Sequence, residues 1–162
     1  MFREMRRNKQ LLSVEETIEI LNSCTAGVLG VSGDDGYPYT VPISYAYQDG
    51  RLFFHSARTG HKIDGIQAND KVTFCAIAKD EVIPETLTTH FRSVSIFGRA
   101  RILTGDDERR AAMECLAEKY SPGRLEQARR EIEHDWNRFC VVEVKIEHMT
   151  GKAAIELVNK KG

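Results

Sequence analysis

Apolar and polar residues alternate along several short stretches of this chain, a pattern typical of strands with one buried face. In the clearest stretch, 39–47, the odd-numbered residues from Tyr39 to Tyr47 are aromatic or aliphatic, and the even-numbered ones are small or polar. Strands are predicted at 26–32, 39–47, 51–56, 71–78, 93–103 and 139–150. Residues 79–88 have no clear period and are predicted to form a loop.

Helical patterns occupy other parts of the chain. Ser13 and Glu16 have the spacing of a capping box, in which each side chain accepts from the other's backbone N–H, so a helix is predicted from there to about Ser23. A second short helix is predicted over about 60–69. Both are short enough to pack outside a sheet rather than to form a helical layer.

Two further helices are predicted between the last two strands. Asp106 or Asp107 is the expected N-cap of the first, and Ser121 followed by Pro122 is the expected start of the second. About six strands joined by hairpins or short loops outnumber these helices. The predicted fold class is therefore mainly β with peripheral α, a six-stranded antiparallel split β-barrel with small outer helices.

The composition fits a single domain spanning residues 1–162, with 41% hydrophobic and 29% charged residues. With 23 basic and 24 acidic residues, the overall charge gives no argument for a nucleic-acid partner. The N-terminal stretch lacks the apolar segment of a signal peptide, and no run approaches the roughly 18 apolar residues of a membrane span. Four scattered cysteines without a C-x-x-C pair favour the reducing cytoplasm.

Polar and cationic side chains are concentrated in the sequence FFHSARTGHKID, residues 53–64. The first N–H groups of the helix expected there point outward, and the helix dipole favours an anion beside them. Ser56 adds a hydroxyl, His61 a hydrogen-bond donor and Lys62 a formal charge. These are the groups from which a phosphate site is commonly built. A solvated loop with ordinary surface cations is the alternative that this stretch leaves open.

Two other positions suggest contact with a ligand. Pro42 interrupts strand 39–47, and because proline cannot donate to a ladder it marks an edge, a bulge or backbone that meets a ligand. A plain edge strand is the commoner explanation. Arg92 and Ser93 lead into strand 93–103, where a guanidinium beside a hydroxyl suits an oxyanion or a polar ring edge. A surface ion pair would explain the same arginine.

Taken together, these stretches resemble a known family. The resemblance lies in MRRNKQLLSVEETIEILNSCTAGVLGVSGDDGYPYTVPISYAY, in LFFHSARTGHKIDGI, in RSVSIFGRARIL and in VVEVKIEHMTGK, in that order along the chain. The ordered set GYPYxVPxxYxY, FHSAxxGxKxDxI and RSVxxFGxA is similar to the pyridoxamine 5'-phosphate oxidase-like FMN-binding split-barrel family. Within that family the chain resembles the nitroimidazole-resistance (Nim-type) branch.

The resemblance implies a homodimer of split barrels, with one FMN in each of two clefts between the subunits. By position, it implies that the backbone of 40–44 runs along the isoalloxazine ring. The end of the next strand would lie beside the flavin, and the start of the following helix would bind the phosphate. The residues assigned to the cofactor are Thr40, Val41, Pro42, Ile43, Ser44, His55, Ser56, His61, Lys62, Arg92 and Ser93. Oxidases of the family have an arginine where this chain has His61, so the positive charge on the phosphate is weaker here. Their substrate-phosphate residues have no clear counterparts in this chain.

The predicted function is an FMN-dependent oxidoreductase that takes electrons from a nicotinamide donor, NAD(P)H, and reduces a small organic acceptor such as a nitroaromatic. His55 is the candidate acid or base, because histidine changes charge near neutral pH. FAD, haem or a deazaflavin are alternative cofactors, and His55 or His90 could ligate haem iron. A non-enzymatic flavin or haem carrier or sensor is the alternative function. The histidine spacings match no zinc motif, so no metal site is predicted.

Overall fold

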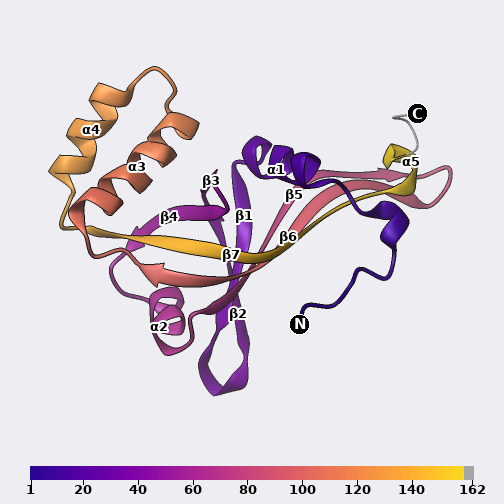
Figure 1. Cartoon of the computed structure of the whole chain (residues 1–162), viewed down its shortest axis with the longest axis horizontal. Helices are drawn as coiled ribbons and strands as arrows, with labels where there is room; N and C mark the ends of the chain where they lie inside the picture. Colours follow the sequence, from indigo (N-terminus) through magenta and orange to yellow (C-terminus); the bar gives the residue numbers. More distant parts are fainter. Residues whose placement is uncertain (159–162) are drawn as a thin grey trace.

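The alternating stretches of the sequence pair into one antiparallel sheet (Figure 1). The computed structural model describes residues 1–158, in which seven strands follow the order β2-β1-β5-β6-β7-β4-β3. The strands are β1 (Ala26–Ser32), β2 (Pro38–Ser44), β3 (Ala46–Gln48), β4 (Arg51–Ala57), β5 (Lys71–Ile83), β6 (Thr88–Ile102) and β7 (Phe139–Ala153). The predicted mainly β class is confirmed, and β2 and β3 are the two sheet edges. The predicted domain extends to Gly162, so its last four positions, 159–162, lie outside the described residues.

The sheet has seven strands rather than six because the predicted strand 39–47 is divided at Tyr45. β2 pairs with β1, whereas β3 pairs with β4, so the chain changes neighbours between Ser44 and Ala46. Tyr45 is fully buried at this change, and its hydroxyl donates to the carbonyl oxygen of Leu21 at 2.7 Å. The alternation of apolar residues continues across the break, which is why the pattern alone predicts one strand.

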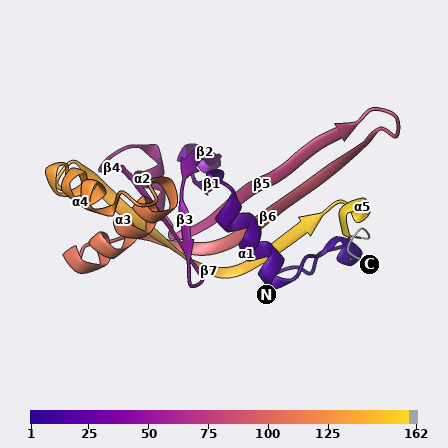
Figure 2. The ribbon, with the colours of Figure 1, turned by 90° about the horizontal axis from the view of Figure 1, so that it is seen from above.

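The prediction of a loop at 79–88 is wrong. β5 and β6 continue through most of this stretch and form a long hairpin arm, residues 79–92, that projects beyond the rest of the sheet (Figure 2). The register of the two strands shifts between Ile77 and Lys79. A shift of this kind interrupts the two-residue alternation, and this interruption removes the period by which strands are predicted.

Five α-helices and two 3₁₀ turns lie outside the sheet in the described part of the chain. They are η1 (Asn8–Gln10), α1 (Val14–Ser23), η2 (Asp34–Gly36), α2 (His61–Ala68), α3 (Asp106–Tyr120), α4 (Leu125–His134) and α5 (Ile155–Val158). The predicted capping box is confirmed, because the N–H of Glu16 donates to Ser13 Oγ at 3.1 Å and the N–H of Ser13 donates to Glu16 Oε2 at 3.0 Å. Across residues 1–158, none of these helices has both the length and the apolar character needed to span a membrane.

The predicted starts of α3 and α4 are both wrong. Gly105 is the N-cap of α3, because the carboxylate of Glu108 reaches back and accepts from the N–H groups of Thr104 and Gly105, each at 3.1 Å. α4 begins at Leu125 rather than at Ser121 and Pro122. The N–H of Ser121 donates instead to the carbonyl oxygen of Ala117 at 2.8 Å and so ends α3.

Strand β4 separates two apolar cores. Leu52 and Phe54 face the interior of the curled sheet together with the inward side chains of the other strands. Phe53, between them, faces outward and packs in a second core beneath α3, which also includes Met113 and Leu116. Burying each such side chain stabilises the fold by about 1.5–3 kcal/mol. The second core fixes α3, with α4 beside it, at one end of the molecule (Figure 1).

Candidate functional site

The connection between β4 and α2 gathers the groups predicted to bind a phosphate. Gly60 has φ = 122°, a left-handed conformation that glycine adopts without strain, and its carbonyl oxygen accepts from the N–H groups of Ile63 and Asp64. The Nζ of Lys62 donates to Ser56 Oγ at 2.9 Å, and Ser56 is buried. An ammonium and a hydroxyl therefore meet beside the first turn of α2, whose leading N–H groups lack intrahelical acceptors.

His61 lies beside the same helix start but contacts a different element. Its ring stacks on Tyr39 with the ring centroids 4.0 Å apart, and its Nε2 lies 3.8 Å from Asp34 Oδ2. Gly33 is close beneath it, because a Cβ added there would lie 3.2 Å from His61 Nε2. His61 thus packs against the turn between β1 and β2, and an exposed carboxylate lies near it.

His55 and Ser56 point to opposite faces of β4, as neighbouring residues of a strand do. The imidazole of His55 lies near the outward core, with its ring centroid 6.0 Å from that of Phe139. Partial burial, and secondly the positive charge of Lys62, lower the pKa of His55 from its ordinary value of 6.5. His55 and Ser44 together border a cavity of about 460 Å³ between the sheet and the helices α3 and α4.

The predicted ring-binding residues 40–44 lie in β2, at one edge of the sheet. Val41 and Ile43 are half-buried and face the core, whereas Thr40, Pro42 and Ser44 are exposed on the other face. Of the explanations for Pro42, the structure shows the edge strand, since within residues 1–158 β2 is hydrogen-bonded to β1 alone. A groove of about 360 Å³ lies along this edge, with Thr40 in its wall.

Arg92 and Ser93 lie far from His55 of the same chain. Arg92 is opposite Ala153 of β7, whereas His55 is opposite Val141, twelve positions earlier (153 − 141). At about 3.3 Å per residue this is about 40 Å along the strand. The Nε of Arg92 is buried and has no hydrogen-bond partner among residues 1–158. One chain therefore does not bring the whole predicted set together.

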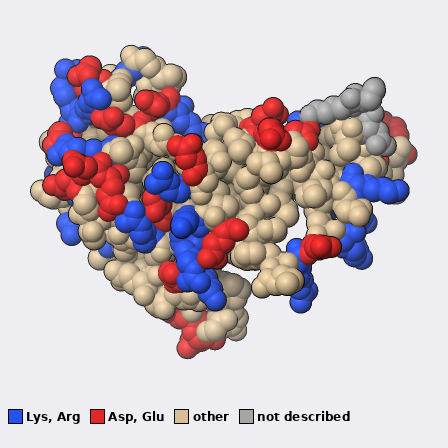
Figure 3. Space-filling model, viewed as in Figure 1, with Lys and Arg blue, Asp and Glu red and all other residues tan. Residues whose placement is uncertain are grey.

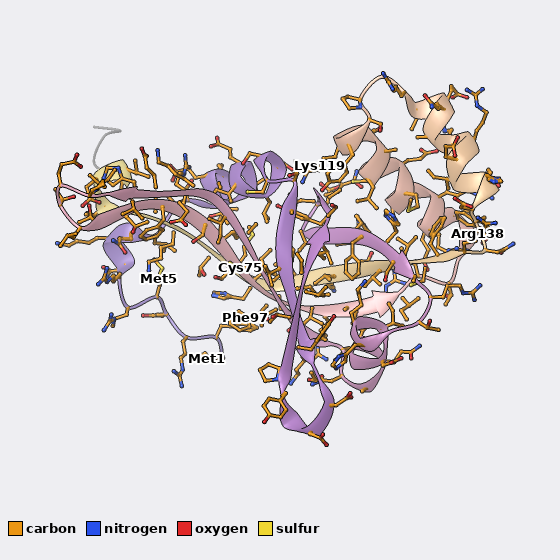
Figure 4. The ribbon with its side chains drawn as sticks, turned by 180° about the vertical axis from the view of Figure 1, so that it is seen from behind. Met1, Met5, Cys75, Phe97, Lys119 and Arg138 are labelled. Atoms are coloured by element: carbon orange, nitrogen blue, oxygen red, sulfur yellow. The ribbon has the colours of Figure 1, made fainter. Side chains whose placement is uncertain are left out.

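The structure also shows residues that sequence reasoning missed. The hydroxyl of Tyr120, at the end of α3, accepts from the N–H of Tyr45 at 2.9 Å and lies 2.6 Å from the carbonyl oxygens of Tyr45 and Thr25. Lys119 donates to the carbonyl oxygens of Leu21 and Cys24 at the end of α1, at 3.2 and 2.6 Å (Figure 4). These contacts link residues 75 to 98 positions apart, so no local signal in the sequence could have revealed them.

Residues 13–153 match a family model described as pyridoxamine 5'-phosphate oxidase. The chain belongs to the pyridoxamine 5'-phosphate oxidase family. This confirms the family predicted from the order of motifs along the chain. A curated relative, uncharacterized protein RA0666 of Rhizobium meliloti (strain 1021), is 32% identical over 131 residues, which cover 74% of this chain and 79% of that protein.

Two solved structures have a similar fold. A putative 5-nitroimidazole antibiotic resistance protein from Bacteroides thetaiotaomicron is 21% identical and superposes with a TM-score of 0.72, over 88% of this chain and 85% of that one. An FAD-binding protein (mll6688) from Mesorhizobium loti is 26% identical with a TM-score of 0.65, over 90% of this chain and 97% of that one. The overall fold of this chain is therefore shared with both structures.

Proposed function

We propose that this chain is a flavin-dependent oxidoreductase that binds FMN between the subunits of a homodimer. The observation that carries the proposal is the pair formed by Lys62 and Ser56 beside the start of α2. Among the described residues no carboxylate forms an ion pair with Lys62, so its charge is available to an anion. A phosphate there would accept from an ammonium, a hydroxyl and helix N–H groups together.

The edge strand β2 supports the second half of the cofactor site. An edge strand presents unpaired backbone N–H and C=O groups, which can bond the polar edge of a flat ring. Thr40 and Ser44 add exposed side-chain hydroxyls on the outward face of the same strand. Family membership and the FAD-binding relative support a flavin in this role. Bound FMN would supply the redox chemistry, which is hydride acceptance from a nicotinamide donor and electron transfer to a small organic acceptor such as a nitroaromatic.

The homodimer is supported by an exposed apolar face of the sheet, the outer face, defined here by Val28, Cys75, Ile77 and Phe97. Val28 is 43% exposed, Ile77 61% and Phe97 44%. They project from the neighbouring strands β1, β5 and β6, and Figure 4 shows Cys75 and Phe97 on this face. A second copy that covers this face could bring its Arg92 and Ser93 toward the first copy's site.

The protein's own residues then have distinct roles. Lys62 and Ser56 hold the phosphate, and the backbone of β2 orients the ring. His55, whose lowered pKa leaves it neutral at pH 7, holds a proton at a ring nitrogen on the side of the α3–α4 cavity. The alternative function, a flavin carrier or sensor, uses the same binding residues but needs no proton transfer by His55.

The experiment compares FMN with riboflavin, which lacks the phosphate. Lys62→Ala removes a charge-assisted hydrogen bond worth roughly 1.5–3 kcal/mol, so FMN binding weakens by roughly 10- to 150-fold while riboflavin binding is nearly unchanged. Lys145→Ala, which removes an exposed lysine of β7, is the control and leaves both unchanged. Equal weakening of both ligands by Lys62→Ala would contradict the phosphate role. The absorption spectrum and the mass of the released cofactor distinguish FMN from FAD, haem or a deazaflavin.

A further inference from the structure

The cavity beside His55, here called the α3–α4 pocket, is walled mainly by two helices. At about 460 Å³ it falls in the size range of small-molecule sites. Met113 and Leu116 of α3 and Ile132 of α4 give it apolar walls. Its inner end is formed by Ser44 and His55 of the sheet.

Helix α4 leaves its apolar side open to this pocket. Ala128 and Ile132 lie four residues apart on α4 and both line the pocket, and no residue across Leu125–His134 is buried, although Ile132 packs partly against the second core. α4 is nonetheless fixed to α3, since Arg129 Nε donates to Glu114 at 2.8 Å and Arg110 pairs with Glu133. The pocket therefore lies between two helices that ion pairs hold together, so it does not result from poor packing of α4.

The rim of the pocket carries balanced charge. Arg124, Gln127 and Glu131 follow one another at helical spacing along the rim, and within residues 1–158 neither Arg124 nor Glu131 forms an ion pair. Figure 3 shows positive and negative side chains intermixed over α3 and α4. An anionic ligand would face Glu131, and a cationic one would face Arg124. An uncharged ligand with hydrogen-bond acceptors meets donors without either repulsion.

The inner end offers further hydrogen-bond donors. Ser44, which carries a hydroxyl, and His55, which carries an imidazole, border it. A neutral imidazole donates one hydrogen bond without adding a charge. Apolar walls with donors at both ends suit a planar ring that carries acceptor oxygens.

We propose that the α3–α4 pocket binds a flat, uncharged aromatic molecule with hydrogen-bond acceptor groups, such as the oxygens of a quinone or a nitro group. Met113, Leu116 and Ile132 enclose the ring, while Arg124 and Gln127 at the rim donate to its oxygens. The role of this ligand as the electron acceptor rests on the function proposed above, whereas its binding is a property of the pocket alone.

The direct test is a titration of the full-length protein with 2-methyl-1,4-naphthoquinone, followed by amide ¹H–¹⁵N spectra. Shifts are expected for residues of α3 and α4 that line the pocket. Ala128→Leu and Ala117→Leu each add volume at the wall and weaken binding at least tenfold. Ala111→Leu, which changes an exposed position of α3, leaves binding unchanged. Shifts confined to other elements, or wall variants that bind as the parent does, would overturn the proposal.

A second readout separates this proposal from the function on which its role rests. In flavin-loaded protein, Ala128→Leu retains the flavin and slows its reoxidation by the naphthoquinone at least tenfold, while reoxidation by dioxygen is unchanged. Loss of flavin in this variant would mean that the pocket holds the cofactor, and would overturn the proposal. A protein that takes up no flavin refutes the proposed function, and the naphthoquinone titration still decides the binding proposal.

Discussion

At the scale of single residues, two adjacent side chains of β4 serve different sides of the sheet. Ser56 faces inward and meets Lys62, whereas His55 faces outward and borders the α3–α4 pocket. The proposed anion-binding group and the proposed proton-transfer group thus lie on opposite faces of the same strand. They remain coupled electrostatically, since the charge of Lys62 contributes to the lowered pKa of His55.

His55→Ala is expected to retain bound flavin and to slow reoxidation by a nitroaromatic or quinone at least about tenfold, because a neutral imidazole can accept a proton and general acid–base help is typically worth about 10²–10⁴-fold. Stopped-flow reoxidation with flavin occupancy measured in the same sample tests this. His55→Gln, which keeps a donor but cannot titrate, is the matched variant and separates hydrogen bonding from proton transfer. If both rate and occupancy are unchanged in His55→Ala, the histidine is structural and the carrier function is favoured.

At the scale of elements, the end of α3 fixes the point where β2 becomes β3. A chain that changes strand neighbours leaves backbone groups without ladder partners, and buried backbone groups need partners. Tyr120 supplies one hydroxyl to the N–H and carbonyl of Tyr45, and burial raises the pKa of this hydroxyl, so it stays protonated. Because Ser44 is the preceding residue, this contact also sets one border of the pocket.

Tyr120→Phe removes these hydrogen bonds while keeping the ring. We expect the free energy of unfolding to fall by about 1–2 kcal/mol, the usual cost of leaving partly buried groups unpaired. Urea unfolding monitored by circular dichroism measures it. Tyr37→Phe, at a position that is 75% exposed, is the control and should match the parent. A change in Tyr120→Phe no larger than in this control would show that water replaces the hydroxyl without cost.

Local sequence patterns predicted the elements that are stabilised by contacts between nearby residues. They failed for elements whose bounds depend on contacts between residues far apart in the sequence. Ser13 and Glu16 cap α1 within four residues, so the sequence alone predicts them. The register shift between Ile77 and Lys79 depends on the pairing of β5 with β6. It interrupts the apolar–polar alternation, and for this reason a loop was wrongly predicted at 79–88. The candidate site was predicted as one set, but strand alternation separates His55 from Ser56. Arg92 of β6 pairs with Ala153 of β7, twelve positions from the residue that pairs with His55, and only the sheet register shows this separation.

At the scale of the whole molecule, the outer face and the hairpin arm point to assembly. Ile77 lies on the outer face, close to where the arm begins, and exposes an aliphatic side chain. Contiguous exposed apolar surface of this kind commonly marks an interface. A charge placed there would have to be desolvated in the dimer, which is costly.

Ile77→Glu is therefore expected to shift the protein from dimer to monomer in light scattering and to lower flavin occupancy with it. Val14→Glu is the matched control, because Val14 is 59% exposed and Ile77 61%, and a carboxylate in the first turn of α1 is compatible with the helix dipole. A parent protein that is monomeric yet binds flavin stoichiometrically would contradict the homodimer.

An open sheet edge is a hazard as well as a binding surface, because it can template the addition of strands from other chains into aggregates. β2 is such an edge, and Pro42 lies at its centre. A proline within a strand is accommodated with its nitrogen on the unpaired side, where it offers no donor. A foreign strand that aligns with β2 thus finds a gap in the middle of the ladder. The protein can keep this edge free for a ligand while remaining protected against fibrous growth along it.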